Sequence, residues 1–134
     1  MNADVFYDSS IVKDILEGSG SKIACDRSQF LGESMKITVS DKGNINHISK
    51  KISEPDHYAV SIDVYRLSPE ASEKLFAEIE DTIVNRGDEN SWTELALDSI
   101  FDMTDFTPMV INGRWFEIDT LDDLHSAEKL FATE

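Results

Sequence analysis

Apolar and polar residues follow two different periods along this chain, and each change of period marks the boundary of a predicted element. Apolar residues that recur every three or four positions predict helices, and strict alternation predicts strands. The resulting order is strand, helix, strand, hairpin, strand, two helices, hairpin and helix, which is a mixed α/β arrangement. Helical spacing covers 9–17, 68–87, 91–101 and 121–132, whereas strand spacing covers 2–8, 21–26, 35–40, 44–48, 57–65, 107–111 and 114–119.

Polar residues at the predicted helix starts support these boundaries. Ser68 precedes Pro69, and proline is favoured at the first helical position because its missing N–H would have no partner there. The segment Ser91-Trp92-Thr93-Glu94 has the spacing of a capping box, and Thr120 with Asp123 has a similar pattern. The helix at 9–17 likewise has a Ser or Asp at its start.

Glycine-containing segments between the elements predict turns. Asp41-Lys42-Gly43 and Asn112-Gly113 each separate two alternating segments, and such sequences favour the tight turns of β-hairpins. Gly18-Ser19-Gly20 follows a helix rather than a strand, so we interpret it as a helix end or linker and not as a phosphate-binding loop. The strand at 21–26 is expected to lie parallel to the strand at 2–8 through a strand–helix–strand crossover.

The composition indicates a single globular domain over 1–134. Of the 134 residues, 40% are apolar and 29% are charged, which is enough apolar material for a buried core. The formal net charge of −15 argues against nucleic acid or an anionic membrane as a partner, because both are polyanions. No apolar run approaches the ~20 residues that span a bilayer. Cys25 is the only cysteine, so an internal disulfide is excluded and a reducing, cytoplasmic location is expected.

Two acidic residues near the C-terminus carry the main candidate chemistry. In the alternating segment 114–119, Glu117 and Asp119 point to one face. Phe116 and Ile118 point to the other face. Both carboxylates lie at the end of a strand, where α/β sheets place ligands and hard cations. The alternative is that they are solvated acids on an edge strand of an acid-rich chain. The three histidines have no ligand spacing, so zinc is not expected.

The segment 115–124, Trp-x-Glu-Ile-Asp-Thr-x-Asp-Asp-Leu, resembles the C-terminal signature of the nucleotidyltransferases that activate phosphorylated alcohols and sugars. Among the sugar-nucleotide pyrophosphorylases, it is most similar to the phosphocholine cytidylyltransferase-like branch. Asn2–Phe6 resembles the central strand whose acid holds the catalytic magnesium in that family. Segments 33–37 and 43–50 look like the hairpin that carries the substrate-phosphate lysine. The likeness covers nearly the whole chain and implies a Rossmann-like α/β fold.

This resemblance implies magnesium-dependent transfer of a nucleotidyl group, with CTP favoured as donor. The acceptor would be a phosphorylated small alcohol, amino-alcohol or sugar, and pyrophosphate would be released. The catalytic residues implied are Asp4, Asp119 and Lys50. Mg²⁺ would be held by Asp4, Asp119 and Glu117, and the acceptor phosphate by Lys50. The residues implied on the substrate-binding side are Lys50, Lys36 and Glu33.

Each of these residues also has a structural interpretation. Asp4 can cap the helix that follows its strand, and Lys50 at a hairpin end can be an exposed lysine that protects a sheet edge. Lys36 alternates along a strand, which favours a solvated position. Trp115 is expected in the core or as a cover of the last strand, rather than as a ring that stacks on choline. Asp63, near a strand end, is a further site candidate. Packing roles are expected for Tyr7, Tyr58 and Tyr65.

One feature of the family is absent from these 134 residues. The family begins with a strand and a glycine-rich loop, with Arg and Lys, that binds the nucleoside triphosphate. Here only six glycines occur, and none follows a strand with basic residues after it. The expectation is a fragment, one chain of a split enzyme, or a domain that has lost catalysis. The two functional hypotheses are a nucleotidyltransferase half that supplies metal and acceptor binding, and a non-catalytic assembly module. The expected partner is the missing half or a second copy.

Overall fold

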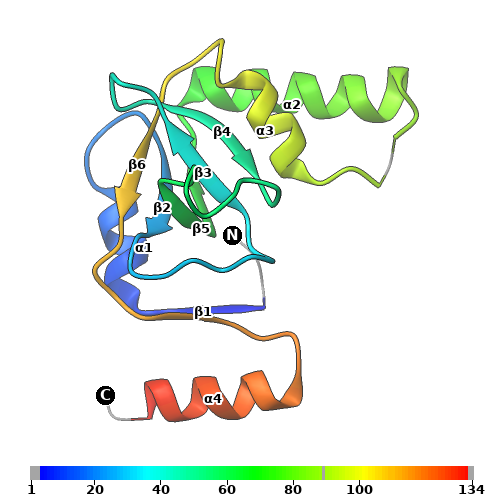
Figure 1. Ribbon diagram of the computed structural model, residues 1–134. Helices are drawn as coiled ribbons and strands as arrows, with labels where there is room; N and C mark the ends of the chain where they lie inside the picture. The colour runs from blue at the N-terminus through cyan, green and yellow to red at the C-terminus, as the bar shows by residue number, and fades with distance from the viewer. Residues whose placement is uncertain (1–3, 89, 133–134) are drawn as a thin grey trace.

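The computed structural model describes residues 4–88 and 90–132. Its strands form a five-stranded sheet of order β4-β3-β5-β2-β6 and a separate two-stranded sheet of β1 and β7, which we call the ribbon (Figure 1). The strands are β1 (Val5–Tyr7), β2 (Ser21–Asp26), β3 (Lys36–Val39), β4 (Ile45–Ser49), β5 (Ala59–Arg66), β6 (Phe106–Val110) and β7 (Trp115–Glu117). The helices are α1 (Ser9–Leu16), α2 (Pro69–Glu80) with a π-helical turn (Asp81–Asn85), α3 (Thr93–Ile100) and α4 (Leu121–Phe131).

The five-stranded sheet is mixed, which confirms the predicted α/β fold with flanking helices. β2 runs antiparallel to β5 and parallel to β6, while β3 runs antiparallel to both β4 and β5. The predicted hairpin of β3 and β4 is confirmed. Gly43 in its turn has a φ of 85°, a conformation that glycine adopts without the steric penalty of a Cβ atom.

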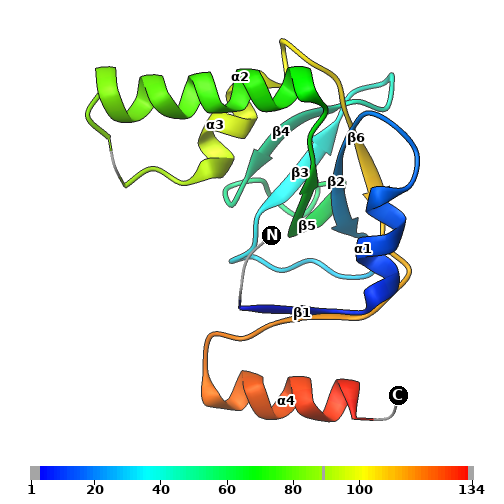
Figure 2. The same cartoon turned by 180° about the vertical axis from the view of Figure 1, so that it is seen from behind.

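Two apolar clusters cover the two faces of this sheet. Side chains alternate across a strand, so Ile23 and Cys25 of β2 join the cluster with α2 and α3, and Ala24 joins the opposite one with α1. Figure 2 shows α2 and α3 together at one end of the molecule, with the ribbon and α4 at the other. The first cluster also includes Ile37, Ala59, Leu75, Leu97, Ile100 and Phe106, and the second includes Ile11, Ile15, Ile62 and Val64.

Two predicted helix caps are confirmed and one is wrong. Ser68 accepts a hydrogen bond from the Ala71 amide with Pro69 in the first turn, and Thr120 forms a capping box with Asp123. The predicted box at 91–94 does not form, because α3 begins one residue later than the pattern requires, with Trp92 as its N-cap. The Ser91 hydroxyl instead donates to Asp88. In the described part of the chain, no helix combines the length and apolarity needed to cross a bilayer.

The predicted hairpin across Asn112-Gly113 is wrong. β6 pairs with β2 in the five-stranded sheet, whereas β7 pairs with β1 in the ribbon, so this dipeptide connects two sheets. Gly113 lies in a closely packed position rather than in a hairpin turn. A Cβ atom there would lie 3.1 Å from side-chain atoms of Asp8, Ser10 and Ile11.

The predicted crossover between β1 and β2 is also wrong. Both edges of β2 are already occupied by β5 and β6, so β1 has no place beside it. β1 pairs antiparallel with β7 instead, with Val5 opposite Glu117. The Tyr7 hydroxyl donates to the Ile62 carbonyl at 2.9 Å, which attaches the ribbon to the five-stranded sheet.

Candidate active site

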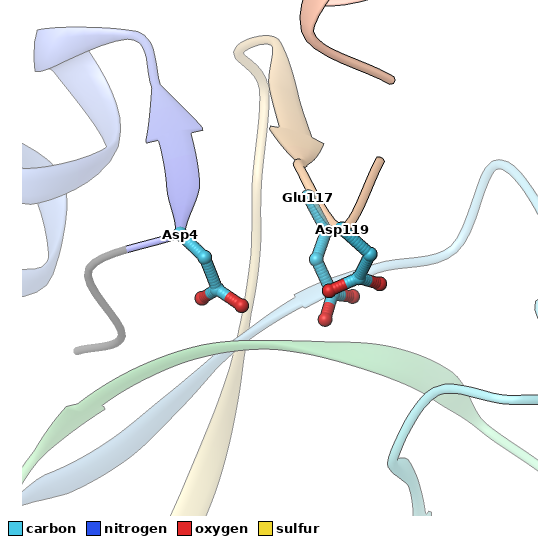
Figure 3. A group of neighbouring side chains, drawn as sticks. All are labelled: Asp4, Glu117 and Asp119. Atoms are coloured by element: carbon cyan, nitrogen blue, oxygen red, sulfur yellow. The ribbon is translucent and has the colours of Figure 1, made fainter. Parts of the chain in front are cut away.

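The ribbon brings together acidic residues from the two ends of the chain. Because β1 and β7 are antiparallel, the residue before β1 lies beside the residues that end β7. The Ile118 amide donates to the Asp4 carbonyl at 2.8 Å. One carboxylate oxygen each from Asp4, Glu117 and Asp119 lies within 4.8 Å of the others, and Figure 3 shows the three side chains on the same side of the ribbon. We call these three residues the acidic triad.

The environment of the triad opposes the negative charge of Glu117. Burial is the main cause that raises the pKa of this half-buried carboxyl, and the charges of Asp119 and Asp63 raise it further. Lys50 acts in the opposite direction. Three carboxylates in this arrangement repel one another, and a divalent cation would relieve that repulsion. Their oxygen atoms are the ligands that Mg²⁺ prefers, so the donor set fits this ion.

The turn after β7 is fixed by the start of α4. The Asp123 carboxylate accepts from the amides of Asp119 and Thr120, both at 3.0 Å, and the Asp123 amide donates to the Thr120 hydroxyl at 3.1 Å. These hydrogen bonds hold the pKa of Asp123 below its usual value. The capping box therefore holds the backbone of one triad member.

Asp63 lies on an irregular part of β5. Between the pairs Ile23–Tyr65 and Cys25–Ser61, three residues of β5 face one residue of β2. Asp63 is in this bulge with a φ of 63°, a left-handed conformation that is uncommon for residues other than glycine. Burial, followed by the charge of Glu94, raises the pKa of the Asp63 carboxyl. The Tyr65 hydroxyl lies 3.2 Å from Asp63 and 3.0 Å from Glu94.

A cavity of about 240 Å³ adjoins the triad through Glu117. It lies where the β5 bulge, the end of β4 and the start of α3 meet. A second cavity of about 390 Å³ is also lined by Glu117 and reaches Asp119. Glu33 and Ser34 line both cavities. The full lining of the first is Glu33, Ser34, Met35, Lys50, Ser61, Asp63, Trp92, Glu94 and Glu117.

Of the described residues that line the 240 Å³ cavity, Lys50 is the only one with a basic side chain. Its ammonium nitrogen lies 4.2 Å from the centroid of the Trp92 ring, a distance at which the ring face attracts a cation. The structure thus places Lys50 and Glu33 in the lining of the same cavity as Glu117. Of the residues implied by sequence resemblance, all except Lys36 lie in the triad or line this cavity.

Lys36 is not solvated, and the surface interpretation is wrong. The side chain is only 1% exposed, because β3 lies between β4 and β5 in the sheet. The ammonium donates to the carbonyls of Gly32 and Lys50 at 2.7 and 2.5 Å. Lys36 lies behind the cavity rather than in its lining.

The two tryptophans have different surroundings. Trp115 packs against the α1 cluster, and its indole N–H donates to Asp26 at 2.8 Å, as expected for a core residue. Trp92 is 54% exposed and faces the cavity. From the sequence, Trp92 was named only as part of a predicted capping box. No local pattern indicates which residues its ring faces, so it was not a predicted site residue.

A larger cavity, of about 520 Å³, is lined by residues of α2, the π-helical turn and α3. It shares Trp92 with the 240 Å³ cavity. Its charged residues include Arg86, which pairs with Glu78 and Asp81. None of the triad lines it, so we place the candidate site at the smaller cavities.

No family model and no curated protein matches this chain. Solved structures do. A Bacillus anthracis protein assigned as a glucose-1-phosphate thymidylyltransferase superposes with a TM-score of 0.73 at 16% identity, over 98% of this chain and 52% of that one. For the inositol-1-phosphate CTP transferase from T. maritima, the TM-score is 0.68 at 18% identity, over 96% of this chain and 52% of that one. For the CTP:phosphocholine cytidylyltransferase from Streptococcus pneumoniae, the TM-score is 0.75 at 13% identity, over 96% of this chain and 55% of that one.

These similarities establish the fold. The chain has the fold of nucleotidyltransferase structures, and it spans about half the length of those it matches. At such low sequence identity, the activity has to be argued from the residues of this chain.

Proposed function

We propose that this chain supplies the metal-binding and acceptor-binding half of a nucleotidyltransferase. The observation that carries the proposal is the convergence of Asp4, Glu117 and Asp119 next to a cavity that contains Lys50. In this proposal the triad holds Mg²⁺, Lys50 binds the phosphate of the acceptor, and Glu33 lines the acceptor site. The similar solved structures support the reaction class, since all three are described as transferases of nucleotides.

The proposed reaction joins a phosphomonoester to a nucleoside monophosphate unit. An oxygen of the acceptor phosphate forms a bond to the α-phosphorus of the triphosphate, and the bond from that phosphorus to the pyrophosphate oxygen breaks. The attacking oxygen is already anionic, so the reaction needs no general base. The bound cation would neutralise charge that develops on the phosphoryl oxygens.

The contribution of the chain's own residues is placement. Lys50 attracts the acceptor phosphate to the wall of the cavity next to Glu117, and the cation–ring contact with Trp92 limits where its ammonium moves. The carboxylates of Asp63 and Glu94, which line the same cavity, repel that phosphate and so favour its position at Lys50. CTP is the proposed donor, and a phosphorylated alcohol, amino-alcohol or sugar is the proposed acceptor. The donor-binding segment in this proposal is a glycine-rich segment outside these 134 residues.

The metal site can be tested on this chain alone. We expect saturating Mg²⁺ or Mn²⁺ to stabilise the chain by about 2.7 kcal/mol at a hundredfold excess over Kd. Asp119→Asn should remove most of that gain and should stabilise the metal-free chain, because it relieves the repulsion. Thermal unfolding with and without the metal provides the measurement. Asp122→Asn, an exposed acid outside the triad, is the matched control, and an equal loss in both variants would contradict the assignment.

Catalysis requires a second measurement. With a chain that carries a glycine-rich nucleotide-binding half, CTP and phosphocholine, we expect metal-dependent release of pyrophosphate. Asp119→Asn should lower its rate by about 10²-fold or more. Metal binding without pyrophosphate release, for every nucleotide and acceptor tried, would instead favour the non-catalytic assembly module.

A further inference from the structure

Lys36 is the most deeply buried charged side chain in the part of the chain that the structure describes. Its ammonium donates to the carbonyl of Gly32, four residues earlier, and to the carbonyl of Lys50 just after β4. The Phe30 ring centroid lies 5.2 Å from the same nitrogen. Each of these contacts joins Lys36 to a segment outside its own strand.

The energetics of this arrangement are unusual for a lysine. A buried ammonium is costly unless hydrogen bonds replace its hydration. The salt bridges among the described residues do not involve Lys36, so its direct partners are carbonyl oxygens, and the Glu33 carboxylate acts on its charge from a longer distance. Hydrogen bonds from a charged donor are stronger than neutral ones. The two bonds therefore hold their acceptors more firmly than ordinary loop contacts do.

Both acceptor carbonyls belong to segments that contribute to the lining of the 240 Å³ cavity, although Gly32 itself does not line it. Gly32 precedes Glu33 and Ser34, which line the cavity on one side, and Lys50 lines it with its own side chain. Gly32 and Lys50 are otherwise exposed. Lys36 thus connects two exposed segments from below, while its own side chain stays out of the cavity.

We propose that Lys36 is a positioning residue, whose buried ammonium fixes the distance between the 32–34 loop and the Lys50 backbone and so shapes the acceptor cavity. It acts through Lys50 and touches no ligand. The relevance to catalysis rests on the proposed function, but the mechanical role does not. Without the ammonium, two carbonyls lose a charged donor, and the two walls move independently.

Hydrogen exchange tests this role directly. In Lys36→Met, which keeps an unbranched apolar side chain without the charge, we expect exchange to accelerate by about tenfold or more at the amides of Ser34 and Lys51, as loss of a charge-assisted hydrogen bond predicts. Exchange in β2 and β6 should stay unchanged. Lys51→Met, at an exposed neighbouring lysine, should behave like the unmodified chain.

A second variant separates the charge from simple filling of space. Lys36→Ala removes the equivalent of n-propylammonium. We expect added n-propylammonium to restore slow exchange in both segments, and 1-propanol to have no effect. Unchanged exchange at both amides in Lys36→Met, uniform acceleration throughout the chain, or equal rescue by propanol would overturn the proposal.

Mn²⁺ binding in the same samples keeps the two proposals distinct. We expect Lys36→Met to bind Mn²⁺ as tightly as the unmodified chain, because the triad lies on the ribbon and Lys36 does not contact it. A loss of Mn²⁺ affinity in this variant would overturn a role confined to the acceptor cavity. Failure of the unmodified chain to bind Mn²⁺ would contradict the proposed function, whereas the exchange data would still decide the role of Lys36.

Discussion

The five-stranded sheet and the ribbon differ in how far they bury their side chains. Ile23, Ile37 and Phe106 of the sheet are fully buried, with no measurable exposure. The strands of the ribbon are each three residues long. Of these six residues, only Val5 is buried. Yet the ribbon and its ends carry the acidic triad. The apolar burial is concentrated in one region and the candidate metal ligands in the other.

This difference shows how the chain can tolerate a cluster of like charges. Hydrophobic burial in the sheet stabilises the whole domain, so repulsion in the ribbon removes only part of the total. The ribbon has few buried residues, and polar contacts such as Tyr7 to the Ile62 carbonyl and Trp115 to Asp26 add to the packing of these two rings against the α1 cluster. Regions with few apolar contacts open at lower free energy than the core. The ribbon is therefore the part in which cation binding should have its largest effect.

The strongest test of this comparison removes one aromatic ring from each region. We expect Phe106→Ala to lower the free energy of unfolding by about 3–5 kcal/mol, because it leaves a cavity against Phe101, whose ring centroid is 5.2 Å away. Phe6→Ala in the half-exposed ribbon should cost about 1 kcal/mol or less. Urea unfolding measures both, and losses of similar size would contradict the division into two regions.

A smaller effect is expected when the ribbon is detached from its neighbours. The Arg114 guanidinium donates to Asp8 at 2.8 Å and to the Leu130 carbonyl at 2.8 Å, which links the ribbon to α4. Arg114→Met should cost about 2 kcal/mol, since it leaves a largely buried carboxylate without this donor. Hydrogen exchange should accelerate in the ribbon and α4 but not in β2. Arg86→Met, at an exposed ion pair, should cost under about 1 kcal/mol.

The smallest expected effect concerns Asp63 and depends on pH. Because its folded-state pKa is raised, the folded chain binds this proton more tightly than the unfolded chain. That stabilisation is complete below the unfolded pKa of about 3.9 and is lost as pH rises through the raised folded value. Asp63→Asn, which tolerates the positive φ, should thus be more stable than the unmodified chain at pH 7 by roughly 1 kcal/mol.

The pH profile of unfolding measures this difference. The advantage of Asp63→Asn should vanish near pH 3, where both side chains are neutral. Asp102→Asn, at an exposed position, is the matched control. An advantage that stays constant over this pH range would exclude burial of the charge as its cause.

Several local features followed from short-range chemistry and were therefore predictable. The caps at Ser68 and Thr120 depend on side-chain hydrogen bonds within four residues, and the turn at Gly43 depends on one backbone conformation. The pairing of Glu117 and Asp119 was predicted from strand alternation, and the two carboxylates do lie close together, but β7 ends at Glu117 and Asp119 lies in the bend before α4. The prediction of a hairpin at Asn112-Gly113 was wrong, because the same dipeptide can also join strands of different sheets. No local signal distinguishes these cases.

By itself, the sequence determined the order of elements, the mixed α/β class and the pair of carboxylates on one face, because each depends on neighbours along the chain. Only the tertiary structure decided that β1 pairs with β7, which brings Asp4 to that pair from more than a hundred residues away. It also decided that Lys36 is buried and that Trp92 faces Lys50. These outcomes depend on which strand edges remain available once the sheet has formed, and that competition is settled by long-range packing.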